Sequence, residues 1–166
     1  MTQQTIDGKL QFQGQQIAPG AEHQLLNIFV GKWHTEGLSY GSGQSYENPY
    51  DSSVRWIGEE SYEWLRGGFF LVHHFDGQVG DSPINGMEFI GYDAASQTYT
   101  SHSFDNHGKI LIGQRSFRDG AWSYIGTDYR NTYVFGNDGN TMTIHWEWLC
   151  GKDLFVLADL KSVKVN

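Results

Sequence analysis

The sequence predicts an all-β fold: an antiparallel, up-and-down barrel of about ten strands, preceded by a short N-terminal helix. From Trp33 onward apolar and polar residues alternate, and turn signals recur about every eight to twelve residues, as in a meander. The composition agrees, with 15% aromatic residues and 21 glycines against 3 prolines. Sequential hairpins leave two exposed edges unless the sheet closes, so we expect a barrel, with a two-sheet sandwich as the alternative.

The chain before Trp33 differs from the rest. Lys9–Ile17 alternates weakly and predicts either a strand or an arm that covers the mouth of the barrel. Ala21–Val30 predicts a short helix that packs on one end of the barrel, because Leu25, Leu26, Ile28 and Phe29 fall on one helical face. We therefore expect an N-terminal arm at 1–18 and a single barrel domain at 19–166.

The strands are expected between successive Gly-, Asp- and Asn-rich turns. Asp119-Gly120 is a strong two-residue hairpin signal. The expected strands are Trp33–Tyr40, Tyr50–Ile57, Glu60–Arg66, Phe69–Gln78, Asn85–Tyr92, Gln97–Phe104, Lys109–Phe117, Ala121–Thr127, Asn131–Phe135, Thr141–Leu149 and Leu154–Val165.

The net charge, the first residues and the single cysteine indicate which partners and which location to expect. Eleven Lys and Arg against 19 Asp and Glu give a net charge of −8, which repels phosphate backbones and anionic lipids. We expect neither a nucleic-acid nor a membrane partner. The first residues lack the pattern of a signal peptide, and the single cysteine, Cys150, cannot form an internal disulfide, so we expect a cytoplasmic location.

Several motifs resemble a known family. Gly31-Lys32-Trp33 after a short helix is similar to the Gly-x-Trp opening of lipocalin-like (calycin) barrels. Together with Trp64–Val72, Ile90–Tyr99 and Ser103-Phe104-Asp105, it resembles a bacterial family of uncharacterised calycin-like proteins. The resemblance implies a closed barrel with an interior pocket, with Trp33 plugging the base. Fatty-acid-binding proteins and nitrobindin-type haem proteins share this architecture, but neither the arginine–tyrosine clamp of the first nor the axial-histidine motif of the second is recognisable in the sequence.

In a barrel alternate residues point inward, so the apolar parity of each strand predicts its lining. This rule gives an interior rich in tryptophan, which suits a flat or partly apolar ligand or simply fills the barrel. The residues predicted to face inward are Val54, Trp56, Tyr62, Trp64, Met87, Phe89, Trp122, Tyr124, Met142, Ile144, Trp146, Trp148, Leu154, Val156 and Leu160.

Histidines are the residues most suggestive of chemistry. By parity His73 and His102 point inward, whereas His34 and His145 face water. His73 and His74 lie on opposite faces of one strand, so they cannot share a metal, and we expect neither a metal nor a cofactor. Glu60 shares the parity of Tyr62, which makes it either a pocket acid with a raised pKa or a solvated residue at a strand start.

The preferred hypothesis is therefore a binding module for a small, largely apolar or aromatic molecule. The predicted ligand-binding residues are Trp56, Tyr62, Trp64, His73, Phe89, His102, Gln114, Trp122, Tyr124, Met142 and Trp146. Three alternatives stay open: an isomerase, cyclase or decarboxylase that uses His73 or His102 with Glu60; a haem protein with one of these histidines as ligand; and a solid barrel that forms homo-oligomers through Ala21–Val30 or a sheet edge.

Overall fold

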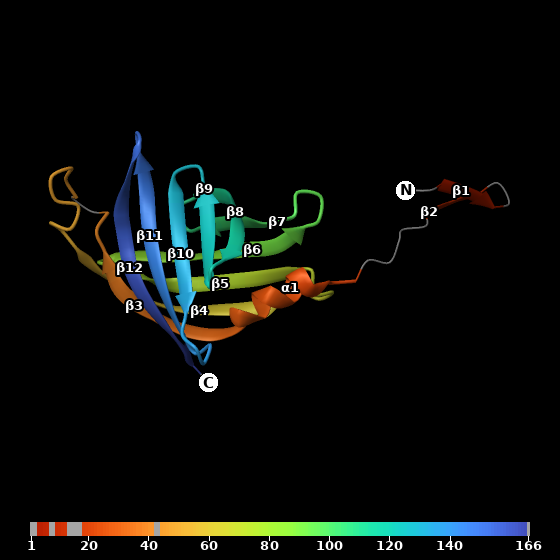
Figure 1. Ribbon diagram of the computed structural model, residues 1–166, viewed down its shortest axis with the longest axis horizontal. Helices are drawn as coiled ribbons and strands as arrows, with labels where there is room; N and C mark the ends of the chain where they lie inside the picture. The colour runs from red at the N-terminus through yellow and green to blue at the C-terminus, as the bar shows by residue number, and fades with distance from the viewer. Residues whose placement is uncertain (1–2, 7–8, 13–17, 42–43, 166) are drawn as a thin grey trace.

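The ten strands that follow the helical segment close into one antiparallel barrel, as the alternation predicted (Figure 1). The computed structural model describes residues 3–6, 9–12, 18–41 and 44–165. Each strand from β3 to β12 pairs with its neighbours in sequence, and β3 pairs with β12 to complete the circle. The strands are β3 (Gly31–Ser39), β4 (Val54–Trp64), β5 (Phe70–Val79), β6 (Ser82–Asp93), β7 (Thr98–Asp105), β8 (Ile110–Arg118), β9 (Ala121–Gly126), β10 (Tyr129–Phe135), β11 (Thr141–Cys150) and β12 (Asp153–Val165).

The helical lead-in is shorter than predicted. An α-helix, α1 (Ala21–Leu25), continues as one 3-10 turn, η1 (Leu26–Ile28), instead of running to Val30. Leu26 and Phe29 are fully buried, whereas Leu25, also assigned to the apolar stripe, is 49% exposed. A helix this short is not stable through its own hydrogen bonds. The burial of Leu26 and Phe29 therefore holds it on the barrel.

The arm predicted at the N-terminus contains a small sheet of its own. β1 (Gln3–Ile6) and β2 (Lys9–Phe12) pair with each other in an antiparallel hairpin. The strand expected over Lys9–Ile17 is thus present as far as Phe12, and its remainder at 13–17 lies outside the described residues.

One predicted break between strands is absent, and one predicted hairpin is present. The separate strands expected at Tyr50–Ile57 and Glu60–Arg66 are one strand, β4, which begins at Val54 and passes through Gly58. The hairpin predicted at Asp119-Gly120 is confirmed, and both residues have positive φ (51° and 80°), as this type of tight turn requires.

Gly58 and Gly77 allow β4 and β5 to approach each other closely on the inner face of the barrel. They lie directly opposite each other in the β4–β5 ladder. A Cβ atom on Gly77 would lie only 2.8 Å from the Cα of Gly58, so a side chain does not fit. The pair lets the two backbones approach, and it leaves the inner wall free of side chains at this point.

One end of the barrel is filled by aromatic side chains. Phe29 is inserted there, with its ring centroid 5.5 Å from Trp122 and 5.0 Å from Phe135. Trp33 is fully buried beside it, and its indole N–H donates to the Phe29 carbonyl oxygen over 2.7 Å. Trp33 therefore lies in the filled base, the position that the Gly-x-Trp resemblance implied.

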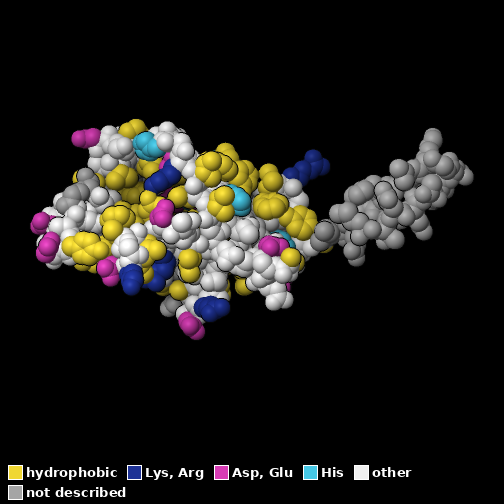
Figure 2. Space-filling view, turned by 90° about the horizontal axis from the view of Figure 1, so that it is seen from above, with side chains coloured by type: hydrophobic (Ala, Val, Ile, Leu, Met, Phe, Trp, Pro, Cys, Tyr) yellow, Lys and Arg dark blue, Asp and Glu magenta, His cyan; other side chains and the backbone are white. Residues whose placement is uncertain are grey.

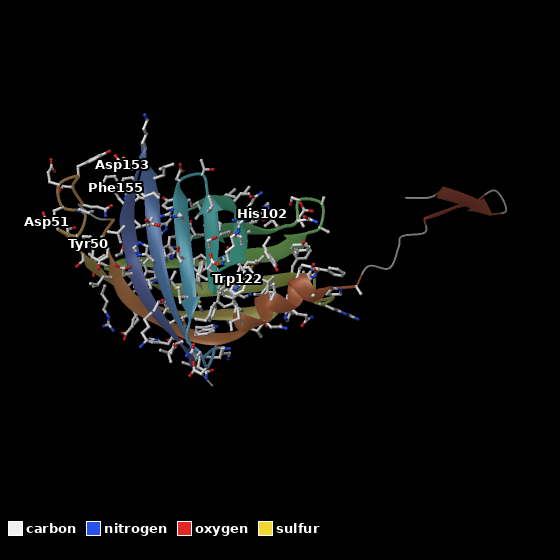
Figure 3. The ribbon with its side chains drawn as sticks, in the orientation of Figure 1. Tyr50, Asp51, His102, Trp122, Asp153 and Phe155 are labelled. Atoms are coloured by element: carbon white, nitrogen blue, oxygen red, sulfur yellow. The ribbon has the colours of Figure 1, made fainter. Side chains whose placement is uncertain are left out.

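The loop before β4 lies at the opposite end of the barrel from α1 (Figures 1 and 3). Gln44 holds it in place, since its amide nitrogen donates to the carbonyl oxygens of Pro49 and Val156 and its amide oxygen accepts from the Trp148 indole. Tyr46 packs edge-on against Phe155, with ring centroids 4.8 Å apart. The loop is thus fastened to the β11–β12 hairpin beside it. Within the described ranges, none of the helices has the length and apolar character needed to cross a bilayer.

Candidate functional site

A cavity of about 300 Å³ lies inside the barrel. Its wall is aromatic and aliphatic, and it also contains several charged side chains. The main lining residues are Trp56, Tyr62, Phe75, Tyr124, Tyr129, Tyr133 and Trp146; Ile84, Leu111, Ile144, Leu157 and Leu160; and Glu60, His73, Glu88, Arg115 and Asn131. A larger concavity of about 890 Å³ borders outward-facing residues such as Glu59, His74 and Asn85, but it is more open to solvent than the interior cavity, so the interior cavity is the candidate site.

Four charged side chains form a continuous buried chain along the cavity. His73 contacts the Glu60 carboxylate through Nε2 at 2.9 Å and the Glu88 carboxylate through Nδ1 at 3.0 Å. Arg115 donates from Nη2 to both Glu88 oxygens, at 2.7 and 2.9 Å. The order is Glu60, His73, Glu88, Arg115, contributed by β4, β5, β6 and β8. We call these four residues the buried quartet.

Hydrogen bonds decide the charge states in the quartet. Burial alone would raise the pKa of Glu88, but the Arg115 charge and the bonds from His73 and Ser101 hold that pKa well below its usual range. Burial likewise opposes ionisation of Glu60, yet its contacts with His73 and Thr35 leave its pKa lowered. Burial would lower the pKa of His73, but its two carboxylate partners raise it. The four contacts therefore favour the ionised form of every member of the quartet.

Tyrosines surround the quartet. The ring of Tyr62 stacks on the His73 imidazole, with centroids 3.9 Å apart and planes 5° from parallel. The Tyr133 hydroxyl oxygen accepts from Arg115 Nη2 at 3.4 Å and from Asn131 Nδ2 at 3.1 Å. Burial and the Glu88 charge raise the pKa of Tyr124 to about 12, so this phenol stays protonated at neutral pH.

Comparisons with known proteins identify a sequence family and a similar solved structure. Residues 18–144 match a family described as a protein of unknown function, DUF1579. The chain belongs to the DUF1579 family. No curated protein matches the sequence. Among solved structures it is similar to the S-type phycobiliprotein lyase CPES from Guillardia theta, with a TM-score of 0.51 and 8% sequence identity over 87% of this chain and 93% of that one. At this identity the likeness concerns the fold alone.

Of the eleven residues predicted to bind a ligand, five line the cavity: Trp56, Tyr62, His73, Tyr124 and Trp146. Trp122 and Met142 are buried as predicted, but they belong to the packed core and not to the cavity wall. Trp64 packs against the core and donates its indole N–H to Asn27 at 2.8 Å, also outside the cavity. Ligand binding by these residues stays a prediction.

Three of the eleven point away from the cavity, so their predicted inward orientation is wrong. Phe89 and His102 lie opposite each other on the outer face of β6 and β7, since Glu88 and Ser101 occupy the inner face. His102, labelled in Figure 3, is exposed. Gln114 on β8 is exposed as well, since Arg115 next to it occupies the inner face. Met87 shares the outward parity of Phe89, and Leu154 is 41% exposed. The parity rule failed because charged side chains, paired with one another, line this part of the interior.

Sequence reasoning missed half of the quartet and part of its surroundings. It did not consider Glu88, Arg115, Asn131 or Tyr133, and for Glu60 it allowed a raised pKa, whereas the Glu60 pKa is lowered. No local motif marks them, because each comes from a different strand. The alternation around Glu88 pointed the wrong way, because it assigns the flanking Met87 and Phe89 to the inner face and Glu88 to the outer one.

The haem alternative does not fit the two histidines proposed for it. Both ring nitrogens of His73 are engaged with carboxylates, which leaves neither free for an axial bond to iron. His102 lies on the outer surface. In the part of the chain that the structure describes, no cluster of three or more His, Cys, Asp or Glu side chains is arranged to hold a metal ion.

Proposed function

We propose that the barrel binds a small, largely apolar molecule with an aromatic part in the cavity next to the buried quartet. The observation that carries this proposal is the cavity itself, about 300 Å³ of space inside the barrel. This volume is at the low end of known small-molecule sites, so the ligand is compact.

The aromatic part of the ligand is inferred from the wall. Trp56 and Trp146 both line the cavity, with ring centroids 5.9 Å apart and planes tilted by 44°. Tyr129 continues this surface, 6.5 Å from Trp146. Each stacked aromatic pair contributes about 0.5 to 1.5 kcal/mol beyond the burial of apolar area. A flat ring placed among these side chains would make several such contacts.

An enzyme that uses His73 with Glu60 as a general base has less support. A base that works near neutral pH needs a pKa close to that pH, whereas the pKa of Glu60 is lowered by its hydrogen bonds. The quartet therefore fits a fixed polar surface for recognition better than a group that exchanges protons with a substrate.

Fluorescence of the neutral probe N-phenyl-1-naphthylamine tests the proposal. We expect saturable binding of one probe per chain, and about tenfold weaker binding for Trp56→Leu, which removes one stacking partner. Trp64→Leu is the matched control, because Trp64 lies on the same strand but does not line the cavity. Absence of saturable binding, or an equal loss in the two variants, would contradict the proposal.

A further inference from the structure

Three polar atoms beside the cavity have no hydrogen-bond partner among the described residues: Nε and Nη1 of Arg115 and Oδ1 of Asn131. Both residues line the cavity, and they are only 2% and 3% exposed. Arg115 directs Nη2 alone at its protein partners, Glu88 and Tyr133. Buried donors and acceptors are nearly always paired in folded proteins, so these three atoms define the chemistry of whatever occupies the adjacent space.

The missing partners are of two kinds. The two Arg115 nitrogens are donors and require an acceptor such as a carbonyl oxygen. Asn131 donates Nδ2 to the Tyr133 hydroxyl, which leaves its amide oxygen to receive a hydrogen bond from an N–H or O–H group. A carboxamide offers both an acceptor oxygen and a donor nitrogen on one small group.

The charge balance of the quartet restricts the ligand further. Glu88 already neutralises Arg115 through both carboxylate oxygens, and Glu60 neutralises His73 at 2.9 Å. Asp76, Asp105 and Lys109 also line the cavity but lie outside the quartet. A ligand carboxylate placed against Arg115 would find that cation already compensated, and a ligand ammonium placed there would add a second, uncompensated positive charge. Buried charges without a partner are strongly unfavourable, so the site discriminates against both.

We infer that the cavity selects an uncharged ligand that carries a carboxamide-like group, whose oxygen accepts from Arg115 and whose N–H donates to Asn131, with an aromatic part against Trp56 and Trp146. This inference rests on the proposed function and adds the polar chemistry and charge of the ligand. It treats Arg115 as a hydrogen-bond donor whose charge is already compensated, and not as a clamp for an acid.

Three naphthalene compounds of the same shape test the inference by displacement of N-phenyl-1-naphthylamine at pH 7.5. They are 2-naphthamide, 2-naphthoate and naphthalene. We expect 2-naphthamide to bind at least tenfold more tightly than either of the others. In the double variant Glu88→Leu/Arg115→Met this preference should disappear while the fluorescent probe still binds; the wild-type comparison stands alone if the variant does not fold.

The other outcomes separate the two proposals. Tightest binding of 2-naphthoate would show that Arg115 can exchange Glu88 for a ligand acid and would overturn the inference. Equal binding of all three compounds, or no displacement by any of them while the fluorescent probe still binds, would overturn it as well and leave the binding function intact. Failure of the fluorescent probe itself to bind would remove both proposals.

Discussion

The buried quartet gives the sharpest stability prediction, through Glu88→Gln. Glu88 is 6% exposed and bonds two other members of the quartet, His73 and Arg115, besides accepting from Ser101. The substitution keeps the shape of the side chain but leaves the Arg115 guanidinium buried without its counter-charge. Breaking one side of a buried ion pair costs about 3 to 5 kcal/mol.

Urea unfolding followed by tryptophan fluorescence measures this cost. With a slope of about 2 kcal/mol per molar urea, the midpoint should fall by roughly 2 M. Glu59→Gln is the matched control, because Glu59 pairs with His34 at 2.6 Å but its side chain is 66% exposed, and we expect a change within about 1 kcal/mol. Replacing both charges in Glu88→Leu/Arg115→Met should restore part of the stability lost in Glu88→Leu. A Glu88→Gln midpoint equal to that of Glu59→Gln would refute the reasoning.

Two further predictions concern the quartet and the plug. The loss of unfolding free energy in His73→Gln should be largest between pH 4.5 and 6.5, as urea titrations at several pH values can show. The lowered pKa of Glu88 contributes stability above its ordinary value of 4.5, and this contribution is lost as the pH falls. The raised pKa of His73 contributes stability below its ordinary value of 6.5, and this contribution is lost as the pH rises. A cost independent of pH would argue against a charged His73. Phe29→Ala should cost about 3 to 5 kcal/mol, since Phe29 is fully buried among aromatic rings, whereas Leu25→Ala, at a side chain 49% exposed, should change the free energy of unfolding by about 0.5 kcal/mol or less. Equal costs in the two variants would mean that Phe29 is not the plug.

The barrel could be predicted because period-two alternation and turn signals are local properties. Trp56, Tyr62 and His73 were assigned to the inner face correctly, since on β4 and β5 the apolar parity is also the inward one. On β6 to β8 the same rule selects the wrong face. There the outer surface carries Phe104, Ile110 and Ile112, which are 45%, 61% and 56% exposed, and Figure 2 shows hydrophobic side chains at the surface of the molecule.

The site could not be predicted for a related reason. Glu88 and Arg115 can be buried inside the barrel because each neutralises the charge of the other. The two residues lie 27 positions apart in the sequence, on strands β6 and β8. Nothing within either strand reveals its partner. The local sequence pattern also did not predict where the helix ends. The helical segment ends at Ile28 because Phe29 is inserted into the barrel and β3 begins at Gly31.

A crystal structure of the protein with 2-naphthamide tests the central claim most directly. The account predicts density for one molecule inside the barrel, with its rings against Trp56 and Trp146 and its carbonyl oxygen within hydrogen-bond distance of Arg115. A barrel interior closed by repacked side chains, with the compound bound only on the outer surface, would contradict it.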